Sequence, residues 1–242
     1  MAPIKKIILT ILSVFIMVTS KAMQEDVYDI NSLLNLLLYA GTVTNDKVLV
    51  KQALEDGANV NYPLYNMTFT LLHYAARTGK YHIAELLLKH GAKVDAQAHY
   101  RTTPLLEAAE AGKTDLVELL LNAGADINHM GTMSYDRPLT IAARNGHLTT
   151  VQTLIARGAK VNQKNFDGNT ALMEATQAGH ENIVGFLLTV PDIDVLIENR
   201  KKQNALNLFK NAIYRNQHNF QQQENRYSSI GKLLQNFLLS LS

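Results

Sequence analysis

Apolar residues along most of this chain recur at the spacing of one helix face. Residues 114–121 carry a broad apolar stripe suited to burial on more than one side, made of Leu116, Val117, Leu119, Leu120 and Leu121. The shorter segment before it, Leu105–Ala109, ends in two alanines that let a neighbouring helix approach closely. This pattern predicts pairs of short helices. Neither helix reaches the roughly 12–15 residues that an isolated helix needs, so each pair must pack against another.

Glycines divide this pattern at a nearly constant interval. Gly-Ala pairs follow one another after 34, 33 and 34 residues, at Gly57-Ala58, Gly91-Ala92, Gly124-Ala125 and Gly158-Ala159. A further glycine stands twelve residues before each of the last three pairs, at Gly79, Gly112 and Gly146, and Asn45 holds that place in the first unit. A fixed period of this length is the mark of a repeat architecture.

Each unit of the repeat contains its own start and stop signals. Thr103 followed by Pro104 predicts a helix start, because the hydroxyl accepts from unpaired N–H groups and proline needs no donor there. Gly112 ends that helix, since glycine enters the left-handed region without strain. Gly124 ends the second helix, and Asp126–Asn128 begins an extended turn toward the next unit.

The segment Thr103–Ala109, together with Gly112 and Gly124–Asn128, resembles the ankyrin repeat, and Asn165–Val184 is similarly close. The resemblance implies an all-α ankyrin-repeat solenoid of helix-turn-helix units with β-turn or hairpin tips. About five to six units fit the chain, including degenerate caps. The expected segments are a signal peptide at 1–22, a divergent capping repeat at 23–60, core repeats at 61–194, and a degenerate repeat with a capping helix at 195–242.

Several positions depart from the family pattern. The family's histidine after Thr-Pro-Leu is present only as His73, so we expect its turn-bracing hydrogen bond in one unit. Pro191 stands where a glycine should end the fifth unit's second helix, which must therefore end differently. We expect the connector 194–204 to lack the family's turn. After it we expect a helix at 204–214, a polar loop at 216–225 and a final amphipathic helix at 230–241.

The first residues have the three parts of a secretory signal. Lys5 and Lys6 precede the uncharged run Ile7–Val18, and small residues stand at Ser20 and Ala22. The alternatives are a membrane anchor or a buried helix, but the run is shorter than the roughly 20 apolar residues of a membrane span. We expect cleavage after Ala22, export to the periplasm or the exterior, and no stable membrane anchor afterwards.

Charge is unevenly distributed along the chain. The whole sequence has a formal net charge of +2, but residues 1–22 contribute +3 and residues 195–242 contribute +5, which leaves −6 for residues 23–194. A nucleic-acid-binding protein normally has a basic face along its body, so we expect no nucleic-acid partner. The chain contains no cysteine, which excludes disulfides, thiolate metal sites and a cysteine nucleophile.

Candidate chemistry is sparse. The eight histidines do not have metal-ligand spacing, and repeat-frame hydrogen bonds account for His73, His147 and His180. No hydrolase, nucleotide-binding or metalloprotease motif occurs. Glu107 and Glu174 lie two units apart, too far to share a proton. We therefore expect no catalytic residues, no cofactor and no metal.

The resemblance implies that partners bind a concave surface of turn tips and first helices. Aromatic, Met and Arg side chains, which are enriched in interface centres, recur on the tips. Charges alternate just after the Ala-Ala pairs, and this alternation fits either weak salt bridges between units or a charge register for a partner. The expected partner-binding residues are Met67, Phe69, Arg77, His99, Tyr100, Glu110, Met133, Asp136, Arg144, Phe166 and Asp167.

These observations predict an exported, monomeric, non-enzymatic scaffold that binds a protein partner. Some tip side chains have an alternative role, which is to fold back over the neighbouring turn. A second hypothesis for the function is an immunity-like module that shields an exported enzyme. A third, catalysis by this chain itself, finds no motif in the sequence.

Overall fold

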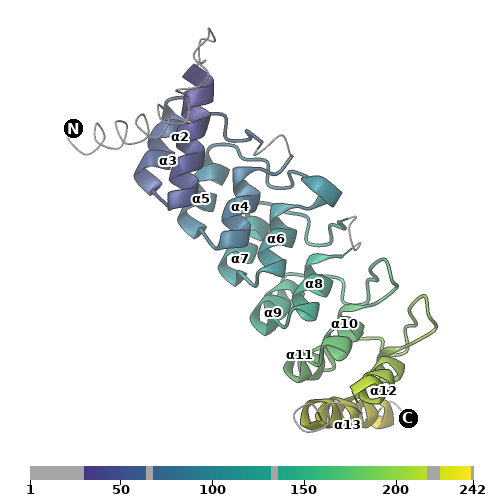
Figure 1. Ribbon diagram of the computed structural model, residues 1–242. Coiled ribbons are helices and arrows are strands. Elements are labelled where there is room, and N and C mark those ends of the chain that lie inside the picture. Colours follow the sequence, from purple (N-terminus) through teal and green to yellow (C-terminus); the bar gives the residue numbers. More distant parts are fainter. Residues whose placement is uncertain (1–29, 64–67, 132–135, 217–223, 241–242) are drawn as a thin grey trace.

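The structure, a computed structural model, describes residues 30–63, 68–131, 136–216 and 224–240. The expected signal peptide lies outside these residues. The described chain forms six consecutive helix pairs lined up side by side (Figure 1). These pairs are α2 (Ile30–Thr44) with α3 (Lys47–Glu55), α4 (Leu71–Thr78) with α5 (Tyr81–Lys89), α6 (Pro104–Glu110) with α7 (Thr114–Asn122), α8 (Pro138–Arg144) with α9 (Leu148–Ala156), α10 (Ala171–Ala178) with α11 (Glu181–Leu187), and α12 (Ala205–Asn216) with α13 (Glu224–Ser240). The all-α solenoid is confirmed.

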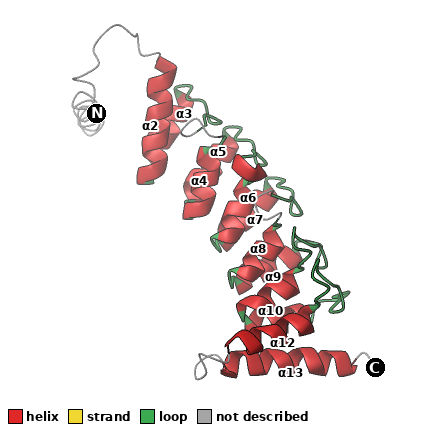
Figure 2. Cartoon of the chain, turned by 45° about the vertical axis from the view of Figure 1, so that its right-hand side comes forward, coloured by secondary structure: helices red, strands yellow, loops and turns green. Residues whose placement is uncertain are grey.

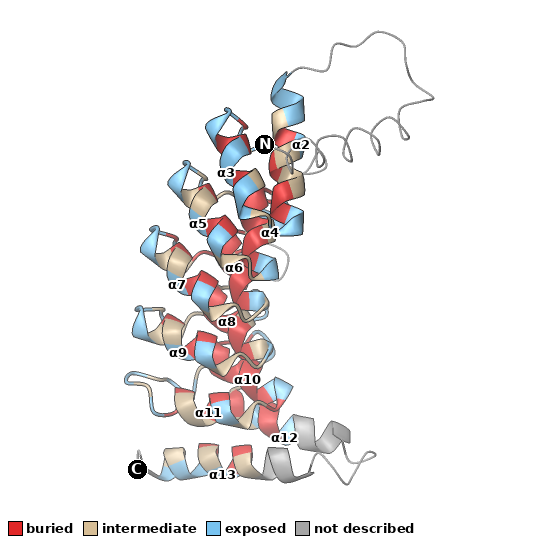
Figure 3. Ribbon diagram, turned by 90° about the vertical axis from the view of Figure 1, so that its left-hand side faces the viewer, coloured by how far each residue is buried: buried red, intermediate tan, exposed pale blue. Residues whose placement is uncertain are grey.

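In the first five pairs the helices form two rows, with the first helix of each pair in one row and the second in the other, and α13 lies across the end of the stack against α11 and α12 (Figure 3). From α4 to α12, neighbouring first helices contact one another more extensively than neighbouring second helices do. The stack therefore curves toward its first helices. The loops that join one pair to the next project together on one side of the stack (Figure 2).

Alanines allow the first helices to approach closely. Ala75, Ala108, Ala142 and Ala175 hold the same position in successive units and are completely buried. Behind them the second helices place a completely buried leucine at one shared position, namely Leu87, Leu120, Leu154 and Leu187. Because each leucine is covered by the neighbouring units as well as its own, one continuous core runs along the solenoid.

The predicted glycine stops are confirmed. Gly79, Gly112, Gly146 and Gly179 all have positive φ, and Asn45 has φ 60° at the same place in the first unit. At Gly112 there is a second reason for glycine, because a Cβ there would lie 2.5 Å from the His147 ring. That histidine donates from Nε2 to the carbonyl of Glu110 at 3.0 Å and so ties two units together.

Short polar side chains at the base of each tip form a ladder between units. The Oδ1 atom of Asn61 accepts from the backbone N–H of Lys93 at 2.9 Å. Asn128 and Asn162 repeat this contact with the N–H groups of Lys160 and Asp194, at 3.1 and 3.0 Å. The Asp95 carboxylate does the same for Asp126. These bonds fix the spacing of consecutive connectors.

The last two units depart from the regular repeat at the end of α11, in the connector that follows and at the start of α13. Helix α11 ends at Leu187, and Asp192 with φ 62° supplies the left-handed residue that Pro191 cannot, so the different ending is confirmed. The expectation that connector 194–204 lacks a tip turn is wrong, because Asn199 N–H donates to Gln203 O at 2.9 Å. The polar loop expected at 216–225 extends too far, because α13 begins at Glu224 and packs against α11 and α12.

Within the described residues, no helix combines the length and apolar character needed to cross a bilayer.

Enlarging an alanine between first helices should separate them. We expect Ala142→Leu to lower the free energy of unfolding by about 1–3 kcal/mol, because extra methylene groups have no space in this contact. Ala156→Leu makes the same change on the exposed end of α9 and serves as the control. Urea unfolding followed by circular dichroism measures both. Equal stabilities for the two variants would contradict close packing of the first helices.

Candidate functional site

The hairpin tips share one hydrogen-bonded turn. The N–H groups of Ala98, Asn165 and Asn199 donate to the carbonyls of Thr102, Asn169 and Gln203 at 2.8–2.9 Å. Gly168 occupies the left-handed apex position of one tip with φ 80°, whereas Arg101 and Lys202 hold the same position with φ 54° and 58°. The tips therefore present charged residues at positions where the backbone favours glycine.

A buried ion-pair network lies where the fourth and fifth units meet. The Arg144 guanidinium donates to both oxygens of Asp136 at 2.6 and 2.7 Å. Its Nε donates to Glu174 Oε2 at 2.8 Å. Such a bidentate arginine–carboxylate pair is both strong and fixed in direction. Arg144 is thus held rigidly, although a third of its side chain remains exposed.

Three asparagines complete this network. Asn165 and Asn169 donate from Nδ2 to Glu174 Oε1, at 2.7 and 3.1 Å, and Asn199 donates to Asn169 Oδ1 at 2.9 Å. Burial alone would raise the pKa of Glu174. The hydrogen bond and the charge of Arg144, together with the hydrogen bonds from Asn169 and Asn165, hold this pKa below its ordinary value. The network therefore pairs one guanidinium with two carboxylates, and it joins three consecutive tips.

The same frame positions two units earlier contain an incomplete version of this site. Arg77 and Glu107 correspond to Arg144 and Glu174, but Phe69, Ala98 and Thr102 replace Asp136, Asn165 and Asn169. The Arg77 Nε lies 3.4 Å from Glu107 Oε2 without hydrogen-bond geometry, and Oε2 is buried without a hydrogen-bond partner. Burial raises the pKa of Glu107 to about 6, an effect that Arg77 opposes and Glu110 strengthens.

His73 braces the tip that follows it. Its Nδ1 accepts from Thr70 N–H at 3.2 Å, so Nε2 carries the proton and donates to Thr102 O at 3.0 Å. Burial lowers the pKa of His73 to about 4, although the hydrogen bonds to the Thr102 and Ala96 backbone oppose the shift. The ring is therefore neutral at pH 7. The expected bracing bond of this histidine is confirmed.

A hollow of about 420 Å³ opens above the Arg144 network. Arg144 comes from α8, while Glu174, Gln177 and Ala178 come from α10, and Asp167 and Asn169 come from the tip between these helices. The hollow thus combines a fixed guanidinium, an exposed carboxylate and an exposed amide. This arrangement suits hydrogen bonds to peptide groups and polar side chains of a partner.

The structure brings only some of the expected partner-binding residues together. Arg144 and Asp167 share the hollow. Tyr100 and His99 are exposed on an earlier tip, with Tyr100 at 60% exposure and φ 57°, and Arg77 and Glu110 are exposed on first helices. Phe166 is exposed at 45% beside Arg200. Met67 and Met133 lie outside the described residues.

Two expected partner-binding residues take part in packing. Asp136 is buried, so the expectation of an exposed tip is wrong there, because its carboxylate is needed to hold Arg144. Phe69 is half-buried, with its ring centroid 4.9 Å from that of His73. The network residues Glu174, Asn165 and Asn199 were not among the expected site residues. The Arg–Glu combination repeated 67 residues apart was the available signal.

In the described part of the chain, no three histidine and carboxylate side chains gather closely enough to hold a metal ion.

A comparison with known protein families agrees with the repeated helix pairs of the structure. A family model described as "Ankyrin repeats (3 copies)" matches residues 37–131 and 105–199. These overlapping matches include well over half of the chain.

Three curated relatives illustrate the similarity. The Drosophila melanogaster "Ankyrin repeat and KH domain-containing protein mask" is 38% identical over 104 residues, which are 43% of this chain and 3% of that protein. The Oryza sativa subsp. japonica "Probable E3 ubiquitin-protein ligase XBOS33" is 49% identical over 51 residues, which are 21% and 10%. The human "2-5A-dependent ribonuclease" is 39% identical over 74 residues, which are 31% and 10%. The matched region is therefore a tenth or less of each relative.

The two glutamates should respond oppositely to neutralisation. Glu174→Gln is expected to lower the free energy of unfolding by about 1–3 kcal/mol at pH 7, because it leaves Arg144 with one carboxylate. Glu107→Gln is expected to stabilise by up to about 2 kcal/mol at pH 7, because its carboxylate is buried without a full partner. Urea unfolding measures both.

The Glu107 effect should depend on pH. Its pKa is about 6 in the folded chain and lower when unfolded, so the native state binds the proton first. The stability of the unmodified chain relative to Glu107→Gln therefore rises as pH falls from 7 toward 4.5. A constant difference over this range would contradict the raised pKa.

Proposed function

The chain belongs to the ankyrin-repeat family, and on that basis we propose that it binds a partner protein through its first helices and hairpin tips. The ankyrin repeats make it a protein-binding scaffold. We further propose that the partner contacts the surface around Arg144, and the hollow there is the observation that mainly supports this. There the fold holds a partly exposed guanidinium in place with two buried carboxylates, which is a costly arrangement for packing alone.

Exposed aromatic side chains on the tips support the same surface. Tyr100 and Phe166 project from tips on both sides of the fourth unit, and their rings offer large area with few rotatable bonds. Tyr100 also keeps a left-handed backbone that a tyrosine adopts only at some cost. The proposal is for a non-enzymatic role, with Arg144, Asp167 and Gln177 providing polar contacts and the rings providing apolar area.

We also propose that the chain is exported. The support is the sequence of residues 1–22, with its two early lysines, its short apolar run and its small residues near Ala22. The function would then be performed outside the cytosol by a chain that begins at Met23.

Removing both rings should abolish partner capture without unfolding the scaffold. We expect the Tyr100→Ala/Phe166→Ala double variant to melt within a few degrees of the unmodified chain, because Tyr100 is 60% exposed and Phe166 is 45% exposed. Affinity purification from the cells that make the protein, with quantitative mass spectrometry, measures the captured proteins. Glu85→Ala/Glu118→Ala changes exposed residues on the second helices and is the control. Recovery of the same proteins by the ring variant would show that another surface binds.

Cleavage should leave a defined new N-terminus. We expect fractionation of the source cells to place the protein outside the cytosol, and N-terminal sequencing of that material to begin at Met23. Retention of a chain with an intact Met1 in the cytosol would contradict export and leave the binding proposal unaffected.

A further inference from the structure

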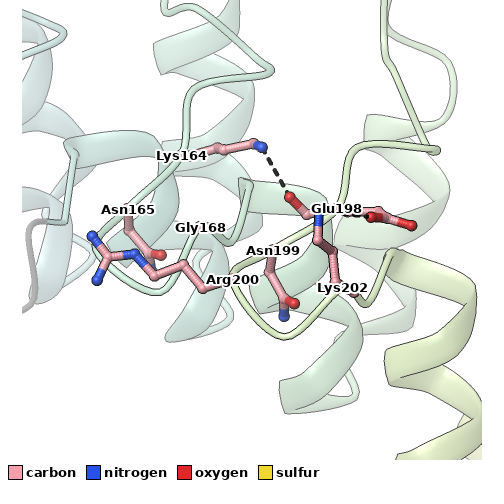
Figure 4. Close-up of a pocket in the computed structure, with 7 residues that line it drawn as sticks. All are labelled: Lys164, Asn165, Gly168, Glu198, Asn199, Arg200 and Lys202. Atoms are coloured by element: carbon pink, nitrogen blue, oxygen red, sulfur yellow. Dashed lines mark hydrogen bonds and ion pairs between the residues drawn. The ribbon is translucent and has the colours of Figure 1, made fainter.

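A second hollow, of about 610 Å³, lies between the last two hairpin tips (Figure 4). One wall consists of Lys164, Asn165 and Gly168, and the other consists of residues 198–200 with Lys202. It does not share a lining residue with the hollow around Arg144. We call it the basic groove.

Positive charge predominates around the basic groove. Its lining includes Lys164, Arg200 and Lys202 against the carboxylate of Glu198, and Lys201 follows Arg200 in the same tip. The Lys202 ammonium lies 3.9 Å from Glu198, but its side chain is 86% exposed, so this ion pair is weak. Lys164 donates to the backbone carbonyl of Glu198 at 2.8 Å, so its partner there is a neutral peptide group.

The walls of the basic groove are rigidly connected. Arg200 N–H donates to the Asp167 carbonyl at 2.9 Å, and the Arg200 guanidinium carbon lies 3.9 Å from the centre of the Phe166 ring. Asn199 accepts from the N–H groups of Lys201 and Gln203 at 2.9 and 3.0 Å. The backbone of the last tip and the Arg200 guanidinium are therefore held in place before any ligand arrives, which lowers the entropic cost of binding.

Lys202 occupies a conformation that suits a different residue. Its φ of 58° places it at the apex position that Gly168 holds in the preceding tip. Glycine would relieve this strain, and the lysine side chain that stands there is 86% exposed. Tip stability alone does not explain this lysine, whereas contact with an anionic group would.

We propose that the basic groove binds an acidic segment of a partner protein, laid across the last two tips. This inference rests on the proposed function and adds the chemistry of the partner. Two or three carboxylates in an extended segment would meet Arg200, Lys202 and Lys201.

The charge distribution favours a protein segment over other polyanions. Residues 23–194 carry a net charge of −6, and the excess of basic residues belongs to residues 195–242. A long polyanion such as DNA, or an anionic membrane, would meet this negative body as well as the groove. A short acidic segment fits within the groove and avoids that repulsion.

The test uses the full chain and a fluorescein-labelled hexaglutamate peptide, with anisotropy measured at about 20 mM salt. We expect saturable binding that weakens about tenfold in Lys201→Glu/Lys202→Glu, because each reversed charge turns an attraction into a repulsion. The control, Lys89→Glu/Lys93→Glu, makes the same net change on exposed residues of the second unit and should bind as the unmodified chain does.

A second variant separates binding from folding. Lys202→Gly relieves the positive φ, so we expect an equal or higher melting temperature together with weaker hexaglutamate binding. A loss of both would assign Lys202 to fold stability and overturn its role in the groove.

Other outcomes would also overturn the proposal. Equal effects of the tip and control variants, or no hexaglutamate binding, would show that the groove is not an acidic-segment site. Tighter binding of a DNA duplex or of phosphatidylserine vesicles, lost in the same tip variant, would assign the groove to another class of ligand. None of these results would alter capture of a partner through Tyr100 and Phe166, so this proposal and the proposed function fail separately.

Discussion

The close approach of the first helices is the constraint on which the rest of this structure depends. Ala108, Ala142 and Ala175 are completely buried between neighbouring first helices, and the second helices, with larger residues, lie farther apart. This difference curves the stack. It also places consecutive hairpin tips near enough for side chains of one tip to form hydrogen bonds with the next, so the proposed binding surface depends on this packing.

The tips gain their rigidity from polar side chains as well as from the core. Arg144, Asp136 and Glu174 form an ion-pair network that three asparagines extend from tip to tip. Two units earlier, Arg77 and Glu107 lack those partners, and the pKa of the glutamate rises accordingly. The same repeat frame thus provides one fixed polar site and one loosely paired site on a single surface.

The repeat period predicted the ends of the first helices well, because a residue just after each helix from α2 to α10 has the left-handed backbone that glycine adopts without strain. The positive φ of Gly112 was expected from the repeat spacing, whereas the close approach of this residue to the His147 ring is seen only in the structure. The last tip was missed because its left-handed residue is Lys202, and backbone strain in a lysine has no sequence signal. Helix α13 starts earlier than composition predicts because it packs against α11 and α12.

The candidate site was less predictable, since it depends on distances across loops. The repeated Arg–Glu combination is visible in the sequence, but the signs of charge alternate from Arg77 to Glu110 to Arg144 and do not identify the partners. Only the structure shows that Arg144 pairs with Asp136 and Glu174. The buried position of Asp136 likewise follows from that pairing. Exposure at Tyr100 and Phe166 was expected from tip geometry and agrees with the structure.

Amide hydrogen exchange of the chain, alone and bound to its captured partner, tests the binding surface most directly. We expect slower exchange on binding at the tips around residues 98–103 and 165–170 and along α6, α8 and α10, with the second helices α5, α7 and α9 unchanged. Protection confined to α5, α7 and α9 would contradict this expectation.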